Sequence, residues 1–294
     1  MIIGHFTANK ILLTYIYSFH MPAFFIISGY LYKPHSWKGT IQAFAVPFIF
    51  LSLVNIIIQL VIGELSFHEL CSINILPRFI HYRYGLGHGF FMGDWFLWAL
   101  IGLRFLFGDI KQLKILRKYY IPIAVICVIY MTFENKLISI DTLFRGYYIG
   151  LMIPSLVFFC TGFFLKDIQW TPKSIHTIYL MPLTLLFFIL PLLNGHCSIN
   201  SNEFGKSYLL FVANAILSTI LLFVICEKLP SSKYNITISK GTLIILGIHM
   251  PIIHLLQIIL PKILSCLIPI ITLVMCYFFI ILCERYFPKL LGKG

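Results

Sequence analysis

The sequence has very few charged side chains, and this scarcity excludes an ordinary water-soluble globular domain. Asp, Glu, Lys and Arg together make up 11% of the 294 residues, whereas about 25% is typical of soluble domains. So little charge cannot cover a surface that faces water. Acidic residues are the rarest, with 10 against 22 basic residues. No basic cluster is dense enough to form a nucleic-acid site, so we expect no nucleic-acid partner.

Metal-binding and redox patterns are also missing. The eight cysteines contain no Cys-x-x-Cys pair and no Cys/His ligand spacing, and no His/Asp/Glu cluster has ligand spacing, so the sequence predicts no metal site. Cys71 and Cys197 fall in segments that we expect outside the membrane, where either a disulfide or two unpaired thiols would fit. The start lacks a charged segment and a small-residue cleavage site, so no cleavable signal peptide is predicted.

Apolar residues, in contrast, are abundant. They make up 60% of the chain, and the mean hydropathy is +0.93. They cluster in runs of about 18 to 22 residues, the length that crosses a hydrocarbon core of about 30 Å. Backbone groups in lipid must be bonded within their own segment, so the runs are predicted to be helices. The predicted segments are 1–6, 15–32, 41–62, 93–107, 119–133, 147–165, 176–193, 208–226, 241–260 and 263–283.

The sequence therefore predicts an all-α fold, a polytopic transmembrane bundle of about ten helices that forms one domain over residues 1–294. Residues 1–6 cannot cross a bilayer, so we expect the first helix to be truncated or re-entrant. Basic residues are roughly twice as frequent on one side of the predicted topology, which makes that side cytoplasmic and places the C-terminus there. This bias is typical of the bacterial inner (plasma) membrane. The longest connection, residues 63–92, is expected outside, as a cap over an outward cavity.

Three stretches of sequence carry a family resemblance. They are Gly4-His5 followed by residues 18–31 (SFHMPAFFIISGYL), residues 93–100 (GDWFLWAL), and residues 239–251 (SKGTLIILGIHMP). Their order and spacing resemble the acyltransferase-3 family of membrane O-acyltransferases, in particular its fucose 4-O-acetylase-like branch, over essentially the whole chain. The chain departs from the family in lacking a basic residue about ten positions before His5, and in having only Lys38 as a basic residue before Pro47.

The resemblance implies a ten-helix membrane enzyme. Such an enzyme moves an acetyl group, or another short acyl group, from cytoplasmic acetyl-CoA or another short acyl-CoA onto a sugar hydroxyl. The acceptor partner would be a surface glycan or a lipid-linked sugar, and the lipid bilayer would surround the protein. No metal cofactor is implied.

Acyl transfer to a hydroxyl needs a base, and His is the usual choice near neutral pH. His5 aligns with the family's catalytic His and is our first candidate, although a His at a membrane boundary can also be a simple interfacial residue. His20 precedes Met21-Pro22 and is the second candidate, with a helix-start residue bonded to backbone as the alternative. Both are expected near the outer face, where they can share one site.

The remaining candidates would bind substrates. Asp94 and Trp95 begin a predicted helix and would contact the acceptor sugar, with Trp95 stacking on its ring, although Asp94 can equally cap the helix. His249 is a further substrate-binding candidate, or else a buried His beside the kink at Pro251. For the CoA phosphates we name Arg104, Ser28 and Lys33. Snorkelling of Arg104 and close helix packing near Ser28 are the open alternatives.

Two other functions remain open at this point. A polytopic glycan transporter or flippase would have a similar number of helices, but it predicts paired internal repeats with broken helices, which the sequence does not show. A truncated and inactive acyltransferase is the second alternative, which the reading frame upstream of Met1 would test.

Overall fold

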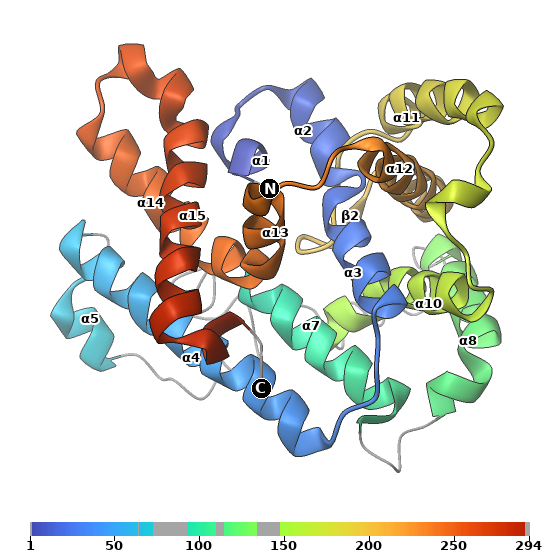
Figure 1. The fold of residues 1–294 in the computed structure, drawn as a ribbon, viewed down its shortest axis with the longest axis horizontal. Helices are drawn as coiled ribbons and strands as arrows, with labels where there is room; N and C mark the ends of the chain where they lie inside the picture. The colour runs from blue at the N-terminus through green and yellow to red at the C-terminus, as the bar shows by residue number, and fades with distance from the viewer. Residues whose placement is uncertain (1, 64, 73–92, 110–114, 134–147, 292–294) are drawn as a thin grey trace.

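A computed structural model describes residues 2–63, 65–72, 93–109, 115–133 and 148–291, and it shows a bundle built almost wholly of helices (Figure 1). The α-helices are α1 (Ile2–Phe6), α2 (Lys10–Tyr17), α3 (His20–Tyr30), α4 (Trp37–Val61), α5 (Phe67–Ser72), α7 (Asp94–Arg104), α8 (Ile115–Phe133), α10 (Met152–Asp167), α11 (Leu180–Asn194), α12 (Tyr208–Lys228), α13 (Lys233–Lys240), α14 (Thr242–Ile259) and α15 (Ile268–Tyr286).

Shorter elements join these helices. The short helical turns are the π-helical η1 (Phe105–Asp109) and the 3₁₀ turns η4 (Tyr148–Leu151), η5 (Pro172–Ser174), η6 (Thr177–Tyr179), η7 (Lys262–Leu267) and η8 (Pro288–Leu291). Between α11 and α12, the strands β1 (Cys197–Ser198) and β2 (Glu203–Phe204) pair antiparallel. The predicted helical class is thus confirmed, apart from this small hairpin. Most of the predicted cap, residues 73–92, lies outside the described part of the chain.

Several helices are suited to a membrane. Within the residues that the structure describes, five helical segments are long and apolar enough to cross one, namely Lys10–Tyr30, Trp37–Val61, Tyr208–Lys228, Thr242–Ile259 and Ile263–Tyr286. A multi-pass membrane protein is therefore supported. The other predicted segments also contain helix, but those helices are shorter or interrupted, as α8 is at Tyr119. The expected count of about ten spanning helices stays a prediction.

One predicted segment, residues 15–32, contains a break rather than one continuous helix. α2 ends at Tyr17 and α3 begins at His20. The break frees backbone groups that need new partners, and the Asn214 side-chain amide of α12 reaches the Ser18 carbonyl oxygen at 3.5 Å. The interruption brings Tyr17 and His20 to the wall of one cavity.

α3 and α10 cross in close contact at two glycines. A Cβ atom at Gly29 would lie 2.1 Å from the Phe159 carbonyl oxygen, and one at Gly162 would lie 1.9 Å from the Ile26 carbonyl oxygen. Only residues without a Cβ fit such a crossing, which is the usual way for membrane helices to approach one another closely. The crossing holds the first motif stretch, on α3, firmly in the bundle.

α7 is an 11-residue helix in the interior of the bundle, and it packs against α4 and α10 (Figure 1). Leu97, Ala99 and Leu103 on this helix are at most 1% exposed. The apolar residues of the predicted segment 93–107 therefore pack against other helices, and a span over this segment stays a prediction. The π-helical turn η1 follows directly and ends at Asp109.

Candidate active site

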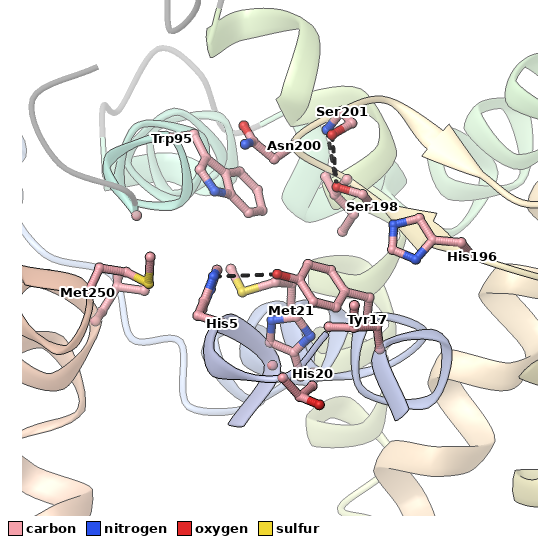
Figure 2. Close-up of a pocket in the computed structure, with 16 residues that line it drawn as sticks. His5, Tyr17, His20, Met21, Trp95, His196, Ser198, Asn200, Ser201 and Met250 are labelled. Carbon is pink, nitrogen blue, oxygen red and sulfur yellow. Dashed lines mark hydrogen bonds between the residues drawn. The ribbon is translucent and has the colours of Figure 1, made fainter. Parts of the chain in front are cut away.

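A cavity of about 450 Å³ opens where α1, the α2–α3 break, the start of α7, the β1–β2 hairpin and α14 meet (Figure 2). Its volume lies within the range of about 300 to 1,000 Å³ that small-molecule sites commonly have. Three histidines and a tyrosine line it, namely His5, His20, His196 and Tyr17. The cavity therefore gathers the residue types that move protons.

His5 lies on α1, which packs against α2, α14 and α15. Its Nδ1 atom is 3.4 Å from the Tyr17 hydroxyl oxygen, and the two rings meet edge to face. Figure 2 shows this contact as a dashed line and the two side chains facing each other across the cavity floor. Catalytic hydrogen bonds are often long before substrate binds, so this geometry suits a ring that Tyr17 orients.

His20 is the first residue of α3 and is 9% exposed. Its Nδ1 atom lies 2.8 Å from the Ile16 carbonyl oxygen. A carbonyl oxygen only accepts, so Nδ1 carries the proton and Nε2 keeps the lone pair in the neutral ring. The ring centroid is 4.9 Å from that of Tyr17. His20 thus lines the cavity, but one of its nitrogens is already committed to the backbone.

His249 lies on α14 directly beside His5, with ring centroids 5.1 Å apart. It is fully buried, and its Nδ1 atom lies 2.7 Å from the Ile245 carbonyl oxygen. His249 is not among the cavity-lining residues. The structure therefore places this predicted substrate contact behind the catalytic candidate, one layer away from the cavity.

Trp95 and Asp94 begin α7, as predicted, and both are largely buried. The Trp95 indole lines the cavity, while Asp94 is not among its lining residues. In the view of Figure 2, the indole lies above His5. Of these two predicted sugar contacts, the structure brings only Trp95 to the cavity.

The CoA candidates lie at the other end of α3. Arg104 is bonded through Nε to Asp109 at 3.1 Å, and its guanidinium lies over the Tyr32 ring. Asp109 also accepts from the Tyr32 hydroxyl at 3.0 Å, from the His35 backbone N–H at 3.0 Å and from the Thr40 hydroxyl. Arg104 is therefore held in a largely buried polar network, and its role as a phosphate ligand stays a prediction.

Tyr32 lies just beyond the Lys10–Tyr30 segment and is one of the donors to Asp109 in this network. Burial and then the Asp109 carboxylate raise the pKa of its phenol well above the usual range, so it stays protonated. The Lys166 ammonium donates to the Tyr32 carbonyl oxygen. Lys33 is exposed and Ser28 is half-buried on α3, so of the predicted phosphate ligands Lys33 is the most open to a ligand.

Of the described cavity residues that can exchange protons, two were not predicted. Tyr17 carries no sequence signal of its own, because it reaches the cavity through the break between α2 and α3. His196 precedes the hairpin, and its ring centroid lies 5.6 Å from that of Tyr17, a contact without any sequence signal. Cys71 and Cys197 are free thiols, exposed and buried respectively. Among the residues that the structure describes, no group of three or more His, Cys, Asp or Glu is placed to hold a metal ion.

Comparison with known protein families gives a match over nearly the whole chain. The model of the acyltransferase-3 family, described as an acyltransferase domain, matches residues 1–284. All three motif stretches fall inside this range, which confirms the family resemblance. No curated protein and no solved structure matches the chain, so the fucose 4-O-acetylase-like branch stays a prediction.

Proposed function

The chain belongs to the acyltransferase-3 family, and from this premise we propose that it is a membrane O-acetyltransferase. It transfers an acetyl group, or another short acyl group, from acyl-CoA to a hydroxyl of a cell-surface or lipid-linked glycan. One observation carries the proposal: the family-aligned His5 lies in a cavity of substrate size, in contact with Tyr17. The fucose 4-O-acetylase-like motifs favour a sugar as the acceptor.

His5 acts as the general base in this proposal. Its Nε2 atom takes the proton of the acceptor hydroxyl while that oxygen attacks the thioester carbonyl carbon. A C–O bond forms, the C–S bond breaks, and the CoA thiolate leaves and receives the proton from His5. A positioned base of this kind contributes about 10²- to 10⁴-fold to a rate.

Tyr17 orients the base in the same step. Its oxygen accepts from Nδ1–H of His5, which leaves Nε2 as the basic atom. Buried His249 lies beside His5 and keeps a lone pair on Nε2, because Nδ1 donates to the Ile245 carbonyl. A neutral polar ring in this place stabilises the positive charge that His5 takes up better than an apolar neighbour would.

The two substrates would approach from opposite ends of α3. The cavity lies at its His20 end, and the basic residues Lys33, Arg104 and Lys166 lie at its Tyr30 end. Eleven residues of helix separate the ends, or roughly 16 Å at about 1.5 Å per residue. We place the Lys33 end and the C-terminus in the cytoplasm, where acyl-CoA is found, in the inner (plasma) membrane of a bacterium.

Transfer of label tests this function. Membranes that contain the chain receive radiolabelled acetyl-CoA, and label is followed into the extracted glycan and glycolipid fraction. His5→Ala should lose at least about 100-fold of the transfer rate, because the base is gone. His176→Ala is the matched control, since His176 is exposed and lies outside the cavity, and it should transfer like the native chain.

The outcomes separate the functions. Label that depends on His5 and not on His176 supports acyl transfer. An equal effect of both substitutions contradicts the role of His5. Absence of label from the native chain, together with label from a chain extended upstream of Met1, indicates the truncated and inactive acyltransferase. Absence of label from both chains overturns glycan acylation and moves the polytopic transporter to first place.

A further inference from the structure

The β1–β2 hairpin forms one polar wall of the cavity. His196, Ser198, Asn200 and Ser201 line the cavity from this short segment (Figure 2). Ser198 donates to Ser201 through its hydroxyl at 3.2 Å. The wall offers hydroxyl, amide and imidazole groups, which both donate and accept.

The hairpin is held rigidly by Asn194 at the end of α11. The Asn194 side chain donates to the Phe204 carbonyl oxygen at 2.9 Å and accepts from the Ser207 backbone N–H at 2.9 Å. Gly205, with φ of +69°, lies so close that a Cβ there would be 2.3 Å from the Asn194 carbonyl oxygen. A wall fixed in this way can hold a substrate at small entropic cost.

Asn200 gives the wall an unsatisfied group. Its Oδ1 atom is buried and has no hydrogen-bond partner within the described part of the chain, and its side chain lines the cavity. A buried amide oxygen without a partner costs about 1 to 3 kcal/mol. A ligand hydroxyl that donates to Oδ1 would remove this cost, so the atom marks a place for a ligand.

Another part of the lining is apolar. Trp95, Met21, Leu246 and Met250 line it, and in the view of Figure 2 the Trp95 indole and the Asn200 amide lie on the same side of the cavity. A ligand that matches has hydroxyls on its edge and a C–H face that stacks on an aromatic ring. A sugar ring has this combination.

The charges of the lining residues limit which sugars the cavity can bind. None of the cavity-lining residues that the structure describes is Lys, Arg, Asp or Glu. A carboxylate or phosphate buried among these described residues would lose its water and meet no permanently charged partner, which is unfavourable. An uncharged ring would lose far less.

We infer that the hairpin residues 196–201 and Trp95 form the acceptor subsite, and that this subsite selects an uncharged sugar ring over uronic acids, sialic acids and phosphorylated sugars. The inference rests on the proposed acyl transfer and adds the acceptor class. The Oδ1 atom of Asn200 accepts a hydrogen bond from one sugar hydroxyl, Ser198 forms a hydrogen bond with a second hydroxyl, and Trp95 stacks on the ring. The hydroxyl that is acylated then lies toward His5.

The location of the transferred acetyl group gives the first test. Membranes with the native chain receive acetyl-CoA that carries ¹³C in its acetyl group, and tandem mass spectrometry locates the heavy acetyl group on the glycan fragments. We expect it on neutral hexose or deoxyhexose residues. A heavy acetyl group on a uronic acid, a sialic acid or a phosphorylated sugar overturns the inference while acyl transfer itself stands.

Binding gives a second test that needs no turnover. The probes are the 4-nitrophenyl glycosides of glucose, galactose and fucose, and the glucuronide and galacturonide that differ from the first two at C6. Saturation-transfer NMR on the purified protein should show at least one neutral glycoside bound about tenfold more tightly than its carboxylate counterpart. Asn200→Ala should weaken that neutral glycoside about tenfold. Equal binding of neutral and acidic members overturns the inference.

Glu203→Gln is the matched control, because Glu203 belongs to the same hairpin but is exposed and does not line the cavity. An equal loss in Asn200→Ala and Glu203→Gln would mean a damaged hairpin and contradict a subsite at Asn200. Binding of the neutral probe without any acetyl transfer would sink the proposed function and leave the sugar subsite standing. The two ideas therefore fail in different ways.

Discussion

The imidazole ring of His249 lies against that of His5, with centroids 5.1 Å apart and planes inclined by 56°. His249 donates through Nδ1 to the Ile245 carbonyl oxygen. Its Nε2 atom is buried and has no hydrogen-bond partner among the described residues. A buried lone pair beside a candidate base can stabilise the positive charge that the base takes up.

His249→Phe should therefore lower kcat about 10- to 100-fold, because the ring volume stays but the acceptor is lost. The KM of the acceptor glycan should change less than twofold, since His249 lies behind the cavity. Acetyl transfer measured at several acceptor concentrations checks this. His249→Gln, which returns an acceptor oxygen, should recover part of kcat. If both variants lowered kcat to the same degree and raised the KM of the acceptor glycan, His249 would have a packing role instead.

Tyr17→Phe should lower kcat about 100-fold with little change in either KM. The substitution removes the hydroxyl that contacts His5 but keeps the ring packed against His20 and His196. Loss of the acceptor at Nδ1 lets the His5 ring turn, and a misplacement of about 1 Å can cost about 10²-fold in rate. Steady-state transfer rates measure the effect.

Tyr15→Phe is the control for Tyr17, because Tyr15 lies on the same helix but its hydroxyl donates to the Phe188 carbonyl oxygen of α11, outside the cavity. It should keep full activity and lose a little thermal stability. If Tyr15→Phe and Tyr17→Phe were equally active, no part of the catalytic proposal for Tyr17 would remain.

The sequence predicted those elements whose pattern is continuous along the chain. Apolar runs of spanning length predicted α4, α12, α14 and α15 to within a few residues, since lipid imposes that length directly. The family motifs predicted His5 and His20 as neighbours, and the structure brings both to one cavity.

The remaining residues of the site and of the polar network could not be predicted, because contacts between distant segments position them. Tyr17 is one of 16 tyrosines, and its role follows from the break between α2 and α3, which interrupts an otherwise helical pattern. Asn200 stands in a loop, and only the anchoring by Asn194 brings it to the cavity. Asp109 follows a predicted span with no pattern around it, yet it binds residues that lie more than 60 positions earlier in the chain.

Asp109→Asn should destabilise the protein strongly. The Asp109 side chain is fully buried and Arg104 is 16% exposed, so loss of the carboxylate leaves a largely buried guanidinium without its partner. Removal of one member of a buried pair typically costs about 3 to 5 kcal/mol. Thermal unfolding of the purified protein in detergent should show a large drop in Tm.

Glu227→Gln is the comparison for Asp109, because Glu227 pairs with Lys173 at 3.3 Å on an exposed face. Exposed pairs contribute about 1 kcal/mol or less, so its Tm should hardly change. A Tm of Asp109→Asn equal to that of the native chain would show that Arg104 does not need the carboxylate, and would return Arg104 to the residues open to a phosphate.

Lys33 should recognise the phosphates of the acyl donor. Its side chain is exposed, and its carbonyl oxygen accepts from Arg104 Nη2 at 3.3 Å, so it lies next to an arginine already bonded to Asp109. We expect Lys33→Gln to raise the KM of acetyl-CoA about five- to tenfold, which corresponds to about 1 to 1.4 kcal/mol. The KM of acetyl-pantetheine, which carries no phosphate, should not change.

The comparison of acetyl-CoA with acetyl-pantetheine makes this prediction specific. A substitution that merely loosens the network around Asp109 would affect acetyl-CoA and acetyl-pantetheine alike, whereas loss of a phosphate contact affects only acetyl-CoA. Lys206→Gln removes an exposed lysine beside the hairpin, near the cavity end, and should leave both values unchanged. If Lys33→Gln also left both unchanged, the donor would have to enter elsewhere, and entry at the Tyr30 end of α3 would be wrong.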